Sequence, residues 1–138
     1  MKTQMGLGNL VGFQGRITRG RFLFHVVVAF ILAQGGFTLE AGFEGPPGTA
    51  MLAVSLALAA LVLASGLARR LHDIDRPGWM ALIGLVPMLT IPATIHIDMT
   101  VGGVDLAAFL PLLGAALVLL LLVYPGTPEP NRYGNNPS

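Results

Sequence analysis

Residues 68–79 read ARRLHDIDRPGW, and this stretch decides the fold because it interrupts an otherwise uncharged part of the chain. It contains three of the eight lysine and arginine residues, two of the seven acidic residues and one of the three histidines. Uncharged runs lie on both sides of it, at 45–68 and at 77–97. A short basic stretch between two long apolar runs is typical of a loop that joins two membrane-spanning helices.

Two further uncharged runs, at 22–39 and at 106–128, bring the number of apolar segments to four. The shortest has 18 residues, and a helix of this length is about 27 Å long, just enough to cross the hydrocarbon core of a bilayer. Only 11% of the residues are charged, whereas a soluble domain usually has about 25%. The sequence therefore predicts an all-α, polytopic membrane protein, a single transmembrane domain built as a four-helix bundle. The predicted spans lie at about 22–39, 46–68, 77–97 and 106–124.

The segments between the spans carry charges of opposite sign on the two sides of the membrane. The connections at 40–44 and 98–105 are acidic and contain no lysine or arginine. All eight lysine and arginine residues lie in the N-terminal segment 1–21, the loop 69–76 and the tail 125–138. Because an excess of lysine and arginine in short loops marks the cytoplasmic side, both termini and the central loop are predicted to be cytoplasmic.

Small residues form a stripe along the second predicted span. Alanines recur there at spacings of three and four residues, which allows another helix to approach closely inside a membrane. Packing within the bundle and contact with another subunit, either a second copy or a membrane-complex partner, both remain open. The stripe consists of Ala53, Ala57, Ala60, Ala64 and Ala68.

The second span is predicted to extend as a helix into the polar stretch. In that case Arg69, His72, Asp73 and Arg76 occur at i, i+3, i+4 and i+7 and share one helical face. Asp73 then pairs with Arg69 and with Arg76. Trp79 follows at the level of the lipid headgroups, where an indole ring is favoured.

Three motifs occur in a fixed order, GRITR at 15–19, RRLHD at 69–73 with GW at 78–79, and NRYG at 131–134. In this combination the chain resembles the YhaH-like family of bacterial inner-membrane proteins, which is catalogued as domain of unknown function 805. The resemblance implies a multi-pass inner-membrane protein and supplies no established activity. The sequence departs from the family pattern at Leu23, where an aromatic residue is common, Asp75, where glycine is common, Pro77, where serine is common, and Met80, where a second tryptophan often occurs.

Because all three motifs lie on the predicted cytoplasmic side, their side chains are expected to converge on one arginine patch. One interpretation is a polar lock, in which Asp73 pairs with arginines and ties the tail to the loop. The other is an anion site for a phospholipid headgroup or phosphate, since arginine binds phosphate through two parallel hydrogen bonds. The arginine patch comprises Arg16, Arg19, Arg69, Arg70, His72, Asp73, Arg76, Trp79, Asn131, Arg132 and Tyr133.

Enzymatic chemistry has little support in the sequence. His72 and Asp73 are suited to general acid–base catalysis, but no nucleophile stands near them in a recognisable motif, so no catalytic residue is predicted. The chain has no cysteine, and its histidines and acidic residues lack dense ligand spacing, so neither a metal site nor a cofactor is predicted. No charged residue is expected near the middle of a span, where ion-coupled transporters usually place one.

The predicted function is that of a non-enzymatic integral protein of the bacterial inner membrane. It is a structural or accessory component whose arginine patch contacts anionic lipid headgroups or a partner, and no nucleic-acid partner is expected. One alternative is a lipid- or phosphate-handling transporter or enzyme that uses the same patch. The other is an accessory subunit of a larger membrane complex.

Overall fold

The computed structural model of the chain describes residues 11–43, 45–89, 100–101, 104–105 and 110–137. Within these residues the regular secondary structure is helical except for one hairpin of two-residue strands, which the prediction of an all-α chain did not include. The segments 12–18, 74–77 and 124–137 are not helical. The hairpin lies in the predicted acidic connection between the third and fourth spans. The elements are α2 (Arg19–Gly42), α3 (Pro46–Asp73), the 3-10 helix η1 (Gly78–Met80), α4 (Ala81–Leu89), β1 (Thr100–Val101), β2 (Val104–Asp105) and α5 (Leu110–Val123).

Helices α2 and α3 are each long and apolar enough to cross a membrane. Helix α2 begins after Thr18, whose hydroxyl accepts a hydrogen bond from the Arg21 amide at 3.3 Å. This N-cap gives a partner to one of the four amides of the first turn that have none within the helix. Helix α3 begins with two prolines, which are tolerated there because their missing N–H groups have no helical partner. Helix α2 contains the span predicted at 22–39, and helix α3 contains the span predicted at 46–68.

Helices α4 and α5 are shorter in the part of the chain that the structure describes. Helix α4 covers 9 residues and α5 covers 14, both inside the spans predicted at 77–97 and 106–124. The remaining parts of those two spans lie largely at 90–97 and 106–109, outside the described residues. Among the described residues two helices are long enough to span a membrane, and the four-span bundle remains a prediction.

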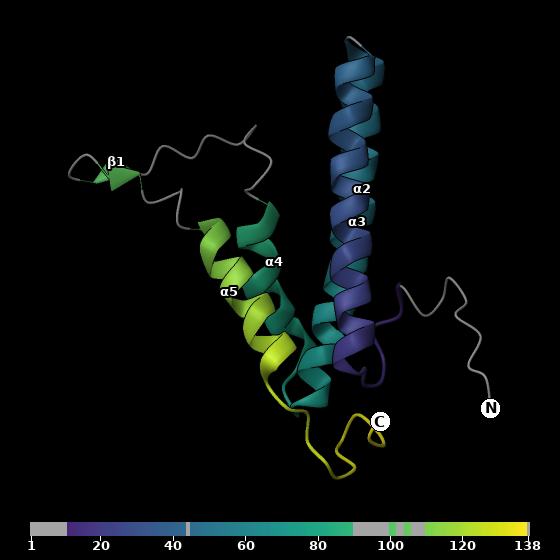
Figure 1. Cartoon of the computed structure of the whole chain (residues 1–138), viewed down its shortest axis with the longest axis vertical. Helices are drawn as coiled ribbons and strands as arrows, with labels where there is room; N and C mark the ends of the chain where they lie inside the picture. The colour runs from purple at the N-terminus through teal and green to yellow at the C-terminus, as the bar shows by residue number, and fades with distance from the viewer. Residues whose placement is uncertain (1–10, 44, 90–99, 102–103, 106–109, 138) are drawn as a thin grey trace.

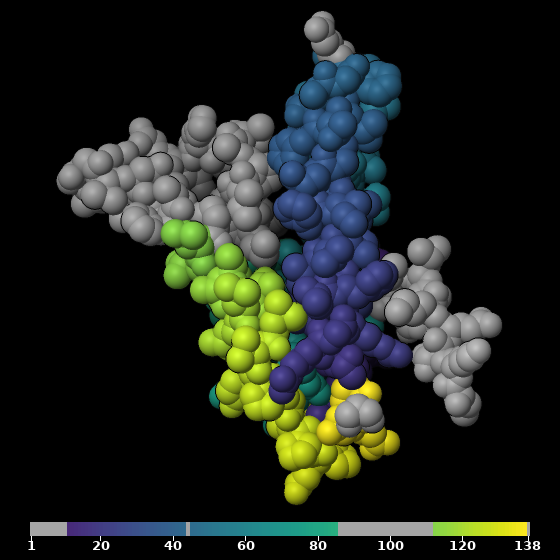
Figure 2. Space-filling view, viewed as in Figure 1, coloured from purple at the N-terminus to yellow at the C-terminus, as the bar shows by residue number. Residues whose placement is uncertain are grey.

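The helices are arranged as two antiparallel pairs, α2 with α3 and α4 with α5 (Figure 1). The two pairs meet where α3 ends and diverge toward the other end of the molecule (Figure 1). We call the shared end, formed by the start of α2 and the ends of α3 and α5 together with residues 124–137, the polar end. In the space-filling view the yellow C-terminal tail covers this end beside the purple start of α2 (Figure 2).

Small residues bring α2 and α3 into close contact. A Cβ atom placed on Gly36 would lie 2.7 Å from the Ser55 Cβ, and one placed on Gly66 would lie 2.7 Å from the His25 Cβ. Such glycines let two helix backbones approach each other where no larger side chain fits.

The alanine stripe predicted on α3 divides into two halves in the structure. Ala68 is buried in the core, and Ala60 and Ala64 are half-buried and pack against it. Ala53 and Ala57, toward the start of the helix, are exposed. Packing within the bundle therefore covers Ala68 and part of Ala60 and Ala64, and it leaves Ala53 and Ala57 uncovered in the single chain.

Candidate functional site

Asp73, the last residue of α3, lies at the centre of the polar end. Its Oδ1 atom is 2.9 Å from both Nε and Nη2 of Arg16, and its Oδ2 atom accepts a hydrogen bond from Nη1 of Arg70. The side chains of both arginines are 1% exposed and that of Asp73 is 4% exposed. We call these three residues the Asp73 network. Its carboxylate lies between two guanidinium groups and is almost completely removed from solvent.

Arg70 uses its other N–H groups to hold the end of α5. Its Nε donates to the Leu121 carbonyl oxygen at 2.9 Å, and its Nη2 donates to the Tyr124 carbonyl oxygen. The carbonyl groups of the last helical turn have no partner within the helix, and a cation there also opposes the negative end of the helix dipole. Arg70 therefore joins the end of α3 to the end of α5.

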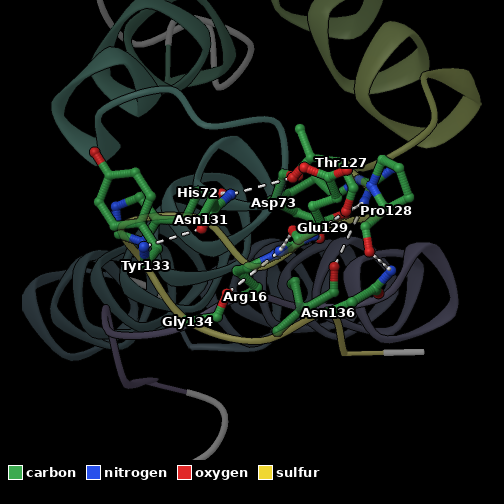
Figure 3. Close-up of polar contacts among 12 residues, drawn as sticks. Arg16, His72, Asp73, Thr127, Pro128, Glu129, Asn131, Tyr133, Gly134 and Asn136 are labelled. Carbon is green, nitrogen blue, oxygen red and sulfur yellow. Dashed lines mark hydrogen bonds and ion pairs between the residues drawn. The ribbon is translucent and has the colours of Figure 1, made fainter.

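Arg16 holds the C-terminal tail in a similar way. Its Nη1 donates to the Glu129 carbonyl oxygen at 2.9 Å, and its Nη2 donates to the Thr127 carbonyl oxygen. Thr127 in turn donates from its amide and its hydroxyl to the Asp73 carbonyl oxygen, at 2.9 and 3.1 Å. Figure 3 shows these contacts converging on Asp73 from the segment before α2 and from the tail.

His72 connects the same segments through its ring. Its Nδ1 lies 3.1 Å from the Gly15 carbonyl oxygen, and its ring stacks on Tyr133 with centroids 3.8 Å apart and an interplanar angle of 9°. Asn131 donates to the His72 carbonyl oxygen at 2.9 Å. A carbonyl oxygen only accepts, so in the neutral ring Nδ1 carries the proton and Nε2 is left as an acceptor.

A second ion pair at the polar end is exposed. Arg132 Nε lies 3.2 Å from Asp75 Oδ1, with the two side chains 58% and 50% exposed. The Arg132 guanidinium also lies 4.9 Å from the centre of the Tyr133 ring, within range of a cation–π interaction. These contacts lie at the exposed surface of the polar end, outside the buried network.

The end of α3 requires an unusual backbone at Asp75. This residue has φ +57°, and the amides of Asp75 and Arg76 donate to the carbonyl oxygens of His72 and Leu71. This pattern is the Schellman motif, which normally has glycine at the left-handed position. Glycine is common at this position in the family that the sequence resembles. This chain has Asp75 instead, at the left-handed position of the motif, where a side chain is least favoured.

The structure brings seven residues of the predicted arginine patch into one connected set. They are Arg16, Arg70, His72, Asp73, Asn131, Arg132 and Tyr133.

The other four patch residues lie around this set. Arg69 is buried and Arg76 is exposed. Arg19 is exposed and lines a cavity of about 390 Å³ together with Arg70 and Asp73. Trp79 is 66% exposed and lies in η1, beyond the end of α3.

The partners predicted for Asp73 differ from those observed. The sequence pointed to Arg69 and Arg76, but the ion pairs of Asp73 run to Arg16 and Arg70. Helical spacing alone does not fix how α3 is rotated about its axis. Arg69 and Arg70 are both buried, and it is the Arg70 guanidinium that reaches both Asp73 and the carbonyl oxygens at the end of α5.

Sequence reasoning also missed the residues that act through the backbone. Gly126 is the clearest, because a Cβ atom placed on it would overlap the Asp73 carboxylate. Thr127 and Gly15 contribute carbonyl oxygens, and backbone acceptors leave no trace in a residue pattern. Within the described residues, no cluster of three or more histidine and acidic side chains is arranged to hold a metal ion.

These features define a class of protein, a helical membrane protein in which a buried arginine–aspartate network joins the helix ends to the C-terminal tail. The chain matches the family described as "Protein of unknown function (DUF805)" over residues 10–135. It belongs to that family, as its three motifs indicated.

Two curated relatives are similar over nearly their whole length. Inner membrane protein YhaI of Escherichia coli (strain K12) is 30% identical over 135 residues, covering 95% of this chain and 90% of that protein. Inner membrane protein YhaH of the same strain is 28% identical over 138 residues, covering 95% and 91%. No solved structure matches the chain. The protein is therefore a member of an inner-membrane family of unknown function.

Proposed function

We propose that this protein is a non-enzymatic, multi-pass component of the bacterial inner membrane with both termini in the cytoplasm. In this proposal the Asp73 network acts as the polar lock that fixes the tail to the bundle. The exposed cations around it contact anionic headgroups or a membrane partner. The observation that carries the proposal is the buried Asp73 carboxylate, which is held between Arg16 and Arg70.

The hydrogen bonds of Arg16 and Arg70 favour a structural role over an anion site. In each guanidinium, Nε, Nη1 and Nη2 all donate to the Asp73 carboxylate or to backbone carbonyl oxygens. A phosphate group would need two free and accessible N–H groups on one face of an arginine. Binding one here would require these contacts to break and two buried side chains to become exposed.

The exposed arginines of the polar end support the lipid-contact part of the proposal. Arg19, Arg76 and Arg132 are exposed around the buried network, and each basic residue near an anionic leaflet contributes about 1 kcal/mol of attraction. The exposed Trp79 ring, in η1 just after the end of α3, suits the headgroup level of a bilayer.

Replacing Asp73 by asparagine tests the lock. Asp73→Asn keeps the shape of the side chain but leaves two buried guanidinium groups without a counter-charge, which costs about 3–5 kcal/mol. We expect less protein in the membrane fraction and a tail that a protease removes rapidly from the purified protein.

Asp75→Asn is the matched control, because it neutralises an exposed carboxylate two residues away and costs less than about 1 kcal/mol. If Asp73→Asn were as abundant and as protected in its tail as the wild type, the polar lock would be refuted.

The proposed orientation has its own test. A fluorescent protein that folds only in the cytoplasm, fused after Ser138, should be fluorescent, and alkaline phosphatase fused at the same site should be inactive. The reverse result would place the tail outside and separate the arginine patch from the anionic cytoplasmic leaflet.

One observation favours the second candidate, an accessory subunit of a larger assembly or a homo-oligomer. Ala53 and Ala57 form the exposed half of the small-residue stripe. Because the chain has no cysteine, Ala57→Cys introduces a unique cross-linking site. Efficient cross-linking in membranes by Ala57→Cys but not by Leu58→Cys, on the neighbouring face, would support this candidate; equal and weak cross-linking would count against it.

A further inference from the structure

A groove of about 400 Å³ lies beside the polar end, between α3, η1 and the start of α4. It is hollow because small residues face it from both sides. Its lining includes Ala64, Ala68, His72, Gly78, Trp79 and Ala81. Part of the alanine stripe therefore forms one wall of a cavity.

The lining of the groove changes in polarity along α3. Ala64, Ala68 and His72 are four residues apart and share one face of the helix, so this wall is about 12 Å long. Its inner end, toward the middle of the apolar span, is lined by alanine, and its outer end, where α3 stops, is lined by a histidine. A molecule with an apolar body and a polar head matches this gradient in the orientation that a lipid has in a bilayer.

The histidine offers an unused hydrogen-bond acceptor to the groove. His72 is only 9% exposed, its Nδ1 is bonded to Gly15, and its Nε2 has no hydrogen bond in the part of the chain that the structure describes. A Cβ atom placed on Gly78 would lie 2.8 Å from Nε2, so this nitrogen faces Gly78, another residue of the lining. Nε2 is not one of the buried, unbonded side-chain atoms of the described residues, so it is accessible from the groove as an acceptor for a ligand that brings an O–H group.

The charge beside His72 selects between possible headgroups. Tyr133 stacks on the His72 ring, and the Arg132 guanidinium lies over Tyr133. Although Arg132 is paired with Asp75, that pair is exposed and screened by water. Its guanidinium still attracts an anionic headgroup and disfavours a cationic ammonium group as the donor. A hydroxyl group on an anionic lipid satisfies both requirements.

We infer that this groove binds one anionic phospholipid whose headgroup carries a hydroxyl group, as in phosphatidylglycerol. An acyl chain lies along Ala64 and Ala68, and the headgroup hydroxyl donates to Nε2 of His72. The inference rests on the proposed contact with anionic headgroups and specifies the lipid, the groove and the accepting atom.

Trp79 makes occupancy of the groove measurable, because it is the single tryptophan of the chain and part of the lining. The full-length protein is placed in phosphatidylcholine nanodiscs that contain small, equal fractions of a lipid brominated on its acyl chains, which quenches nearby tryptophan fluorescence. Three brominated lipids are compared: phosphatidylglycerol, phosphatidylmethanol, which has the same charge but no hydroxyl group, and phosphatidylcholine.

We expect phosphatidylglycerol to compete for the site about fivefold better than phosphatidylmethanol, the factor contributed by one hydrogen bond of ordinary net strength. Phosphatidylmethanol should in turn quench more than phosphatidylcholine because of its charge. Equal quenching by phosphatidylglycerol and phosphatidylmethanol would overturn the assignment to His72, and this comparison needs only the wild-type protein.

Two variants locate the effect in the groove. Ala64→Leu fills the apolar end and should remove the preference among the three lipids, whereas Ala57→Leu, on the exposed part of the same helix, should leave it unchanged. His72→Phe keeps an aromatic ring against Tyr133 but removes both ring nitrogens, so the contact of Nδ1 with Gly15 is lost together with Nε2. In the folded variant, we expect the difference between phosphatidylglycerol and phosphatidylmethanol to disappear while the preference of both over phosphatidylcholine remains.

A preference that survives Ala64→Leu would refute the groove as the binding site. None of these variants changes the Asp73 network. The inference can therefore fail while the Asp73→Asn test supports the polar lock, and the polar lock can fail while the lipid preference is observed.

Discussion

The buried Asp73 network and the exposed pair of Arg132 and Asp75 lie within a few residues of each other at the end of α3, and they differ almost completely in their surroundings. In the Asp73 network the side chains are between 1% and 4% exposed, whereas Arg132 and Asp75 are 58% and 50% exposed. A buried pair repays its desolvation only when its remaining hydrogen-bonding groups are satisfied, whereas an exposed pair is screened by water and contributes little. Identical chemistry two residues apart in sequence is therefore expected to have very different effects on stability.

The largest expected effect comes from removing one arginine of the buried network. Arg70→Ala leaves the Asp73 carboxylate with a single counter-charge and the carbonyl groups of Leu121 and Tyr124 without their donor. We expect the free energy of unfolding to fall by about 3–5 kcal/mol, measured by thermal unfolding of the purified protein in detergent.

Arg70→Lys separates charge from geometry in the same experiment. Lysine retains the positive charge but not the planar set of donors that reaches an aspartate and two carbonyl groups at once, so we expect only partial recovery. Arg76→Ala, which removes an exposed arginine, serves as the control. A loss in Arg76→Ala as large as that in Arg70→Ala would remove the distinction between the buried and the exposed cations.

A smaller effect is expected where the tail packs against the buried carboxylate. In Gly126→Ala the new Cβ atom would overlap the Asp73 carboxylate, so the tail or the carboxylate must move. Overpacking of a tight site typically costs about 1–3 kcal/mol. We expect faster proteolysis of the tail, followed by gel electrophoresis and mass spectrometry of the released peptide.

Gly20→Ala is the matched control for this prediction, because a Cβ atom on Gly20 meets no atom within 4 Å. Inside α2, alanine is also favoured over glycine, so this variant should be as stable as the wild type or slightly more stable. Unchanged proteolysis of Gly126→Ala would mean that the tail is not held against Asp73 as described.

The sequence predicted the apolar segments and the grouping of charge better than it predicted individual contacts. Runs without charge and the separation of basic from acidic connections are properties of whole segments. A prediction based on them stays correct when the ends of a segment are misplaced by a few residues. The family membership and the inner-membrane class were confirmed, while four spans and cytoplasmic termini stay predictions. The convergence of the three motifs at one end followed from the same segment-level reasoning.

The partners of Asp73 could not be predicted in this way. Arg69 and Arg70 are both buried, and each lies about one helical turn from Asp73, so helical spacing does not decide between them. Arg16 lies 57 residues from Asp73 in the sequence, and no periodic pattern connects the two. The role of Gly126 depends on the path of the tail, which has no periodic pattern. The hairpin of β1 and β2 is also too short to leave a strand-like alternation in the sequence.

The smallest expected effect lies at the exposed pair, where two contributions nearly cancel. Asp75 has φ +57°, a conformation that glycine adopts without steric cost, so Asp75→Gly relieves strain of about 1 kcal/mol. The same change removes the carboxylate paired with Arg132, which at this exposure contributes less than about 1 kcal/mol. Since Arg132 also donates to the Asp75 carbonyl oxygen at 2.9 Å, part of its contact survives the substitution. We therefore expect Asp75→Gly to be as stable as the wild type or slightly more stable.

The contribution of the exposed pair itself is isolated by introducing Arg132→Ala into the wild type and into Asp75→Gly and measuring thermal unfolding of all four proteins. An interaction energy between Arg132 and Asp75 above about 2 kcal/mol would show that the exposed pair resembles the buried one.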